Sequence, residues 1–84
     1  MPWSIRWTDQ ALRDLSSLDS PVVRRIVAKL DRAAERPEHF FRRLAGADDY
    51  KLRVGDYRVV ATLDHVTRTV LVERVGHRSH IYDR

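Results

Sequence analysis

Residues 50–60 carry the sequence YKLRVGDYRVV, in which apolar and polar side chains alternate up to a glycine–aspartate pair at positions 55–56. Alternation with a period of two predicts a β-strand with one buried face. A glycine followed by a polar residue between two such runs suits a two-residue type II′ turn. In the register that this turn sets, Arg53 lies directly opposite Arg58, and Lys51 shares their face. The stretch therefore predicts a tight antiparallel hairpin with one basic face.

The segments around this hairpin predict an α+β fold. Capping residues and a proline early in a helix mark two helix starts, and two helices joined by few residues form an antiparallel hairpin. The expected elements are a strand over residues 3–7, a helix capped by Thr8, a second helix from an N-cap at Ser20 to near Pro37, and strands over residues 50–54, 57–63 and 69–75. We expect the last three strands to form an antiparallel meander with the helices on one face.

Aromatic and apolar side chains outside the hairpin indicate further core contacts. Trp3 and Trp7 share one face of the first strand, which favours packing on the core or on a partner over stacking on bases. Phe40, Phe41 and Leu44 are expected to cover an edge of the core.

Length and composition suit one domain over residues 1–84, with 43% apolar residues and no cysteine. The missing cysteines exclude disulfides and thiol-ligated zinc, and they favour the cytoplasm. No apolar run is long enough for a membrane span or a signal peptide. Of 16 cationic residues only Lys29 and Lys51 are lysines, and the net charge of +4 indicates an anionic partner such as nucleic acid.

The basic face of the hairpin admits two interpretations. Like charges opposite each other cost roughly 0.2–1 kcal/mol, so Arg53 and Arg58 favour a phosphate-binding face, where arginine offers bidentate donors. Alternatively the face is only solvated, with Glu73 beside Arg58 to relieve the repulsion. The residues alone leave both open.

The tail, GHRSHIYDR over residues 76–84, concentrates side chains that bind phosphates, transfer protons or stack on bases. His77 and His80 could form a metal pair, but no third ligand accompanies them, and Tyr82 could instead plug the core. His39 and His65 are expected to be surface residues. We find no phosphate-binding glycine loop, no zinc-protease motif and no nucleophile elbow. If the protein is an enzyme, its chemistry must therefore use Lys, Arg, His and Tyr side chains.

The chain resembles the RelE-type toxins of bacterial and archaeal toxin–antitoxin modules over nearly its whole length. The resemblance is carried by LDSPVVRRIVAKLDRA in the helices, LAGADDYKLRVGDYRVV in the hairpin and VERVGHRSHIYDR in the last strand and tail. It implies a ribosome-dependent enzyme that enters the A site and cleaves mRNA there. The resemblance further implies that no metal or other cofactor takes part, and that the ribose 2′-OH attacks the adjacent phosphate and leaves a 2′,3′-cyclic phosphate.

The resemblance also implies roles for individual residues. Arg58 would clamp the phosphate, and Arg78 would act near the leaving 5′-oxygen. Tyr82 would orient or stack a base, while Lys51 and Arg53 form a basic pair in which Lys51 is a candidate general base. Tyr82 and the tail histidines, His77 and His80, are alternative proton-transfer groups, and both histidines are candidates for substrate binding.

The family implies a partner as well, a RelB-like antitoxin encoded in the same operon that forms a heteromeric complex with the toxin. Two other functions stay open on the sequence. ParE-type toxins share this fold and inhibit DNA gyrase without cleaving anything, although they generally lack the full set of Lys, Arg and tail Tyr. An inactive member that only binds nucleic acid or antitoxin is the third possibility.

Overall fold

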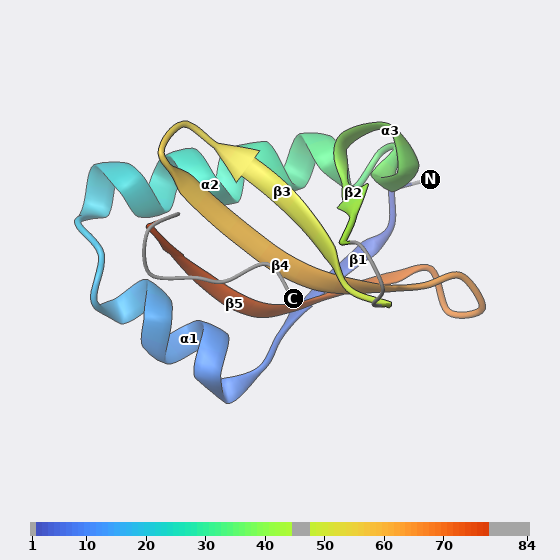
Figure 1. Cartoon of the computed structure of the whole chain (residues 1–84), viewed down its shortest axis with the longest axis horizontal. Coiled ribbons are helices and arrows are strands. Elements are labelled where there is room, and N and C mark those ends of the chain that lie inside the picture. The colour runs from blue at the N-terminus through green and yellow to red at the C-terminus, as the bar shows by residue number, and fades with distance from the viewer. Residues whose placement is uncertain (1, 45–47, 78–84) are drawn as a thin grey trace.

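The computed structural model describes residues 2–44 and 48–77 and places a five-stranded sheet beside two main helices (Figure 1). The strand order is β1-β5-β4-β3-β2. The elements are β1 (Ser4–Trp7), α1 (Asp9–Ser16), α2 (Ser20–Ala33), α3 (Pro37–Phe40), β2 (Arg42–Arg43), β3 (Tyr50–Val54), β4 (Tyr57–Asp64) and β5 (Thr69–His77). This confirms the α+β fold predicted from the sequence, including the meander of β3, β4 and β5.

Two strands complete the sheet in ways that the sequence did not predict. β1 pairs with β5 in parallel, so the sheet is mixed. The two-residue strand β2 pairs antiparallel with the start of β3 and forms the opposite edge. β1 and β5 are separated in the chain by all the other elements, so local patterns do not predict their pairing. β2 has only two residues, too few to show the alternation that predicts a strand.

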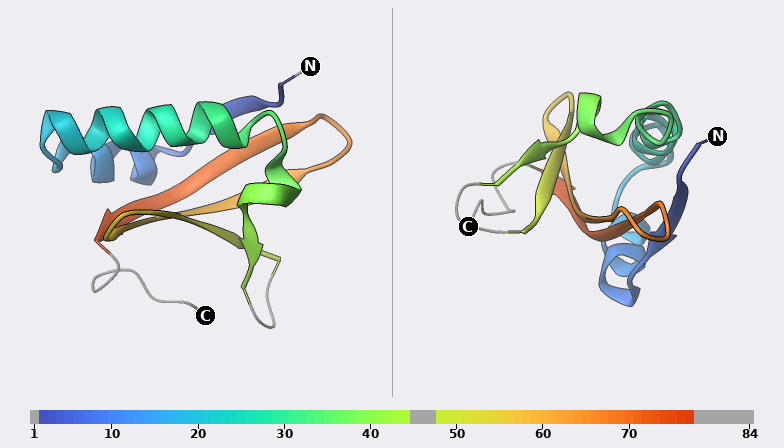
Figure 2. Two further views of the ribbon diagram at one scale, coloured as in Figure 1. Left: turned by 90° about the horizontal axis from the view of Figure 1, so that it is seen from above. Right: turned by 90° about the vertical axis from the view of Figure 1, so that its right-hand side faces the viewer.

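The helices cover one side of the sheet, as predicted. The view from above in Figure 2 shows α1 and α2 on the same side, and Figure 1 shows them running in roughly opposite directions. Thr8 caps α1 as expected, since its hydroxyl accepts a hydrogen bond of 3.1 Å from the amide of Ala11. In the described part of the chain, no helix is long and apolar enough to cross a membrane.

The boundaries of α2 differ from the prediction at both ends. Asp19, rather than Ser20, is the N-cap, and Ser20 is already helical. The helix ends at Ala33 instead of near Pro37, and Pro37 begins the short helix α3. A proline can occupy the first turn of a helix because it lacks only an amide proton that has no partner there. Pro37 therefore starts a new turn where we expected it to end the previous helix.

The main core lies between the helices and the sheet. Ile26 and Leu30 of α2 are buried against Leu52, Val59 and other residues of β3, β4 and β5. Trp3, Trp7 and Phe40 are half-buried against this core, and Phe41 belongs to it, as expected from the sequence. Leu44 departs from the expectation, because it packs with Val60 in a separate small cluster. Val60 pairs with Lys51 and so lies on the other face of the sheet.

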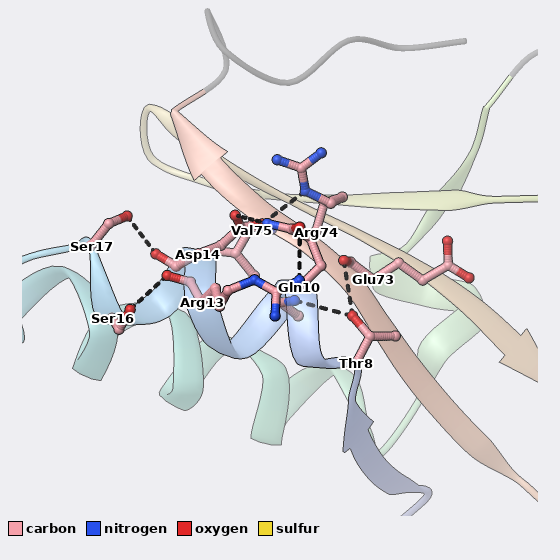
Figure 3. A network of polar contacts seen from close by, with 10 residues as sticks. Thr8, Gln10, Arg13, Asp14, Ser16, Ser17, Glu73, Arg74 and Val75 are labelled. Atoms are coloured by element: carbon pink, nitrogen blue, oxygen red, sulfur yellow. Dashed lines mark hydrogen bonds and ion pairs between the residues drawn. The ribbon is translucent and has the colours of Figure 1, made fainter.

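α1 is attached to the free edge of β5, just beyond the residues that β1 covers (Figure 3). The Thr8 hydroxyl donates to the Glu73 carbonyl oxygen at 3.1 Å, and Asp14 Oδ2 accepts from the Val75 amide and from Arg74 Nε, both at 2.9 Å. The side chains of α1 therefore satisfy backbone groups of β5 that would otherwise lack a strand partner.

The carboxylate of Asp14 should make stability depend on acid pH. Burial raises its pKa, but hydrogen bonds from Arg74, Val75 and Gln10 outweigh this effect, so the pKa lies below its usual value of 3.8. Because the folded-state pKa is depressed, the stabilisation is present above the unfolded value and is lost as pH falls through the folded value.

We predict that Asp14→Asn lowers the free energy of unfolding by about 1–3 kcal/mol at pH 7, since a neutral amide accepts these hydrogen bonds less well. Chemical denaturation between pH 7 and pH 2 measures the difference from wild type, which should shrink at the acid end. Asp31→Asn, at an exposed position of α2, is the matched control. An equal effect of both substitutions would contradict this role for Asp14.

Candidate functional site

The β3–β4 hairpin has the turn and register that the sequence predicted. Gly55 has a φ of +59°, whereas Asp56 has no positive φ, as a type II′ turn requires. Arg53 pairs with Arg58 across the two strands. Since directly opposite residues of antiparallel strands share a face, both side chains project on the same side.

The face that carries these arginines is the one turned away from the helices. Leu52 and Val54 are buried on the helix side, whereas Arg53 is exposed and Lys51 and Arg58 are half-buried. The side chains alternate along the strand, so positions 51 and 53 share the other face. The structure thus brings together three of the predicted site residues, Lys51, Arg53 and Arg58.

A hollow of about 400 Å³ lies along β3 and collects further cations. β2 places Arg42 directly opposite Lys51, so a second pair of like charges lies beside the first. The described residues that line the hollow are Lys29, His39, Phe40, Arg42, Lys51, Leu52, Arg53 and Arg58, and no acidic residue is among them. Such a lining suits an anionic ligand, because guanidinium groups bind phosphate oxygens through paired donors.

Three of the lining residues were missed or misjudged from the sequence. His39 was expected to be an ordinary surface residue, and neither Lys29 nor Arg42 was singled out as a site residue. Lys29 had one signal in the sequence, since it lies three residues after Ile26 and next to Leu30, beside the apolar stripe of its helix. Arg42 could not be placed without knowing that a strand as short as β2 forms.

The alternative in which Glu73 relieves the charge of Arg58 is wrong. Gly76 lies opposite Arg58, and an irregularity between Val60 and Ala61 shifts the register of β4 and β5 before Glu73 is reached. Burial raises the pKa of Glu73, and the nearby charge of Asp49 raises it further, while a hydrogen bond with Thr62 opposes the shift. Because glycine has no side chain, β5 places no side chain opposite Arg58.

Of the four tail residues singled out from the sequence, the structure describes only His77. His77 pairs with Tyr57, which packs against the core, and their rings meet edge to face at 5.5 Å. His77 therefore lies on the helix side, where it lines a second hollow with Asp14. Arg78, His80 and Tyr82 lie outside the described residues, and so does the metal pair of His77 with His80.

Known proteins are similar to this chain in both sequence and fold. A family model described as the ParE toxin of the type II toxin–antitoxin system parDE matches residues 5–82. Toxin RelG of Mycobacterium tuberculosis is 36% identical over 89 residues, with 100% of both chains covered. The chain belongs to the RelE/ParE superfamily of type II toxins.

Solved structures of RelE toxins agree with this assignment. The toxin–antitoxin complex RelBE2 of Mycobacterium tuberculosis contains a chain that matches with a TM-score of 0.81 and 28% identity, over 93% of this chain and 100% of that one. The intact RelBE complex of E. coli contains a chain with a TM-score of 0.75 and 30% identity, over 89% and 95% of the two chains. The RelE-like fold of the chain is thus confirmed, mixed sheet included.

The pair Arg53–Arg58 should make this RelE/ParE domain less stable than its core would allow. We predict that Arg53→Thr raises the free energy of unfolding by about 0.2–1 kcal/mol at low salt, because a like-charge pair directly across two strands is removed. The gain should shrink as salt screens the repulsion. Denaturation at two salt concentrations measures it, with Arg6→Thr on β1 as the control. No gain at low salt would mean that the pair costs nothing.

Proposed function

We propose that the chain is the toxin of a type II toxin–antitoxin system and acts as a ribosome-dependent, metal-independent endoribonuclease that cleaves mRNA in the A site. The observation that carries this proposal is the placement of Arg53 opposite Arg58, next to Lys51, in a hollow with no acidic residue in its described lining. The resemblance gives Arg58 the role of clamping the scissile phosphate and makes Lys51 and Arg53 a basic pair in the first strand of the same hairpin.

The chemistry needs little more than fixed positive charge and two proton transfers. The 2′-oxygen forms a bond to phosphorus as its proton leaves for a base, and the bond to the 5′-oxygen breaks as that oxygen takes a proton. Negative charge develops on the phosphate oxygens meanwhile, and preorganised donors stabilise it most in a site that excludes water. We assign Arg58 and Arg53 to the phosphate oxygens and Arg78 to the leaving oxygen.

The remaining roles fall to Lys51 and the tail. Lys51, which shares the face of the arginine pair, is a candidate general base, with Tyr82, His77 and His80 as alternatives. Tyr82 would orient or stack the base next to the scissile bond. His77 would act from the far end of β5, since its ring lies beside Tyr57 on the helix side.

A RelB-like antitoxin is the proposed partner. The RelE chains of Mycobacterium tuberculosis and E. coli were crystallised as complexes with their antitoxins. The chain carries a net charge of +4, and its hollow is lined by cations, so an acidic segment of an antitoxin would complement it. Such a segment would also block access of mRNA to the site.

A second candidate function is the inhibition of DNA gyrase without cleavage. It is favoured by one observation, the match of a ParE family model to residues 5–82. Retention of Lys51, Arg58, Arg78 and Tyr82 favours cleavage instead, because a toxin that only binds gyrase has no need for a set of phosphate donors. A translating extract and a gyrase supercoiling assay, run with the same purified protein, separate the two.

We predict that the wild type produces mRNA ends inside codons at the A site, mapped by primer extension, and leaves supercoiling intact. Arg58→Ala and Arg78→Ala should each slow single-turnover cleavage by about 100- to 1,000-fold, as expected for a lost transition-state donor. Arg24→Ala, an exposed position on α2, is the control and should cleave normally.

Two results would count against the assignment. Intact mRNA together with blocked supercoiling would identify a gyrase inhibitor. Cleavage by a folded Arg58→Ala variant at the wild-type rate would remove Arg58 from the site. Circular dichroism of each variant separates a lost donor from a lost fold.

A further inference from the structure

The hollow beside β3 holds more positive charge than one phosphate requires. Arg53 of β3 pairs with Arg58 of β4 on one side of the strand. On the other side, Lys51 pairs with Arg42 of β2. Each pair is a like-charge pair directly across two strands, and each costs stability. Positions 51 and 53 share a face and lie about 7 Å apart along the strand, so the positive charge forms two neighbouring groups.

The size of the hollow fits more than a single phosphate group. Its volume of about 400 Å³ falls within the range of about 300–1,000 Å³ that is typical of pockets for drug-sized ligands. β2 pairs only with Tyr50 and Lys51, so no described strand covers the edge of β3 beyond them. The hollow extends along this uncovered edge to the residues of α2 and α3 that line it.

Lys29 lies near an aromatic ring at the helix side of the hollow. Its Nζ lies 6.0 Å from the centroid of the Phe40 ring, and the His39 ring meets Phe40 edge to face at 5.2 Å. The Arg32 guanidinium carbon lies at the same 6.0 Å from this ring. Phe40 in turn packs against the main core. Because an aromatic face attracts cations, Phe40 draws positive charge of α2 toward the hollow, which Lys29 and Phe40 both line.

We propose that Lys29 and Arg42 form a second phosphate subsite, which binds the phosphodiester next to the one at Arg53 and Arg58. The assignment of the first phosphate rests on the proposed function. Arg42 supplies paired donors from the exposed strand β2, and Lys29 supplies a point charge from α2. The ligand class is a single-stranded RNA segment with at least two consecutive phosphates. Lys51 lies between the two subsites.

The second subsite would add affinity only for a ligand long enough to reach it. A dinucleotide has one phosphodiester and occupies the arginine pair alone, whereas a trinucleotide has two. Substitution of Lys29 or Arg42 should therefore weaken binding of the trinucleotide and leave the affinity for the dinucleotide unchanged. A general loss of positive field would weaken both, because long-range attraction does not depend on where each phosphate lies.

The test is an NMR titration of the full chain with uncleavable oligonucleotides that carry 2′-deoxyribose on the 5′ side of each linkage and no terminal phosphate. We expect wild type to bind the trinucleotide about fivefold more tightly than the dinucleotide at low salt, and the salt slope of log K to be larger by about 0.7 for the added phosphate contact. Lys29→Gln and Arg42→Gln should each reduce this gain, and the double variant should abolish it. Arg24→Gln, which removes one cation from the same helix outside the hollow, should keep it.

Two outcomes overturn the subsite. Equal affinity of wild type for the two oligonucleotides, or no binding of either, means that no second phosphate is held. An equal loss for both oligonucleotides in Lys29→Gln means that the lysine contributes only to the general field. The proposed nuclease activity is judged separately by primer extension: a preserved gain from the second phosphate without mRNA cleavage would leave the subsite in place and refute the enzyme.

Discussion

The two-residue turn at Gly55 is the constraint on which both sides of the sheet depend. Its φ of +59° favours glycine, and a Cβ there would lie 2.7 Å from Nη2 of Arg25, which α2 places over the turn. The turn sets the register of β3 against β4. That register puts Leu52 opposite Val59 on the helix side and Arg53 opposite Arg58 on the other. A slip of one residue would exchange the faces of a strand, so the turn that completes the core also builds the basic face.

The exposed edges of β5 and β3 differ in how their backbone groups are covered, and the site lies at the less covered edge, that of β3. At β5, where β1 stops, Thr8 and Asp14 of α1 satisfy the backbone groups that follow. At β3, the partner β2 is only two residues long. From Leu52 onward, none of the described strands pairs with this edge of β3. An uncovered edge normally invites pairing with other chains, and cations along an edge oppose this. The same cations that line the hollow therefore protect the domain from edge-to-edge association.

The sequence predicted those parts of the fold that depend on neighbours in the chain. The strands β3, β4 and β5, the turn at Gly55 and the cap at Thr8 all follow from local patterns, and with them the trio of Lys51, Arg53 and Arg58. What it missed depends on contacts that local patterns do not show. The pairing of β2 with β3 brings Arg42 to Lys51, and the packing of α2 and α3 brings Lys29 to the same hollow. The predicted place of Glu73 beside Arg58 was wrong because an irregularity after Val60 changes the register of β4 against β5. Nothing in the local sequence pattern indicates this irregularity.

The basic face is stable only because the same strands bury apolar side chains on their other side. Leu52 and Val54, on either side of Arg53, and Val59, next to Arg58, are buried on the helix side of the sheet. Burial of one such side chain stabilises by about 1.5–3 kcal/mol, more than the repulsion of a like-charge pair costs. An anion bound in the hollow would remove that repulsion, and a ligand that binds only the folded state raises its stability. The charge arrangement would thus couple folding to occupancy for either of the proposed ligands, RNA or an acidic antitoxin segment.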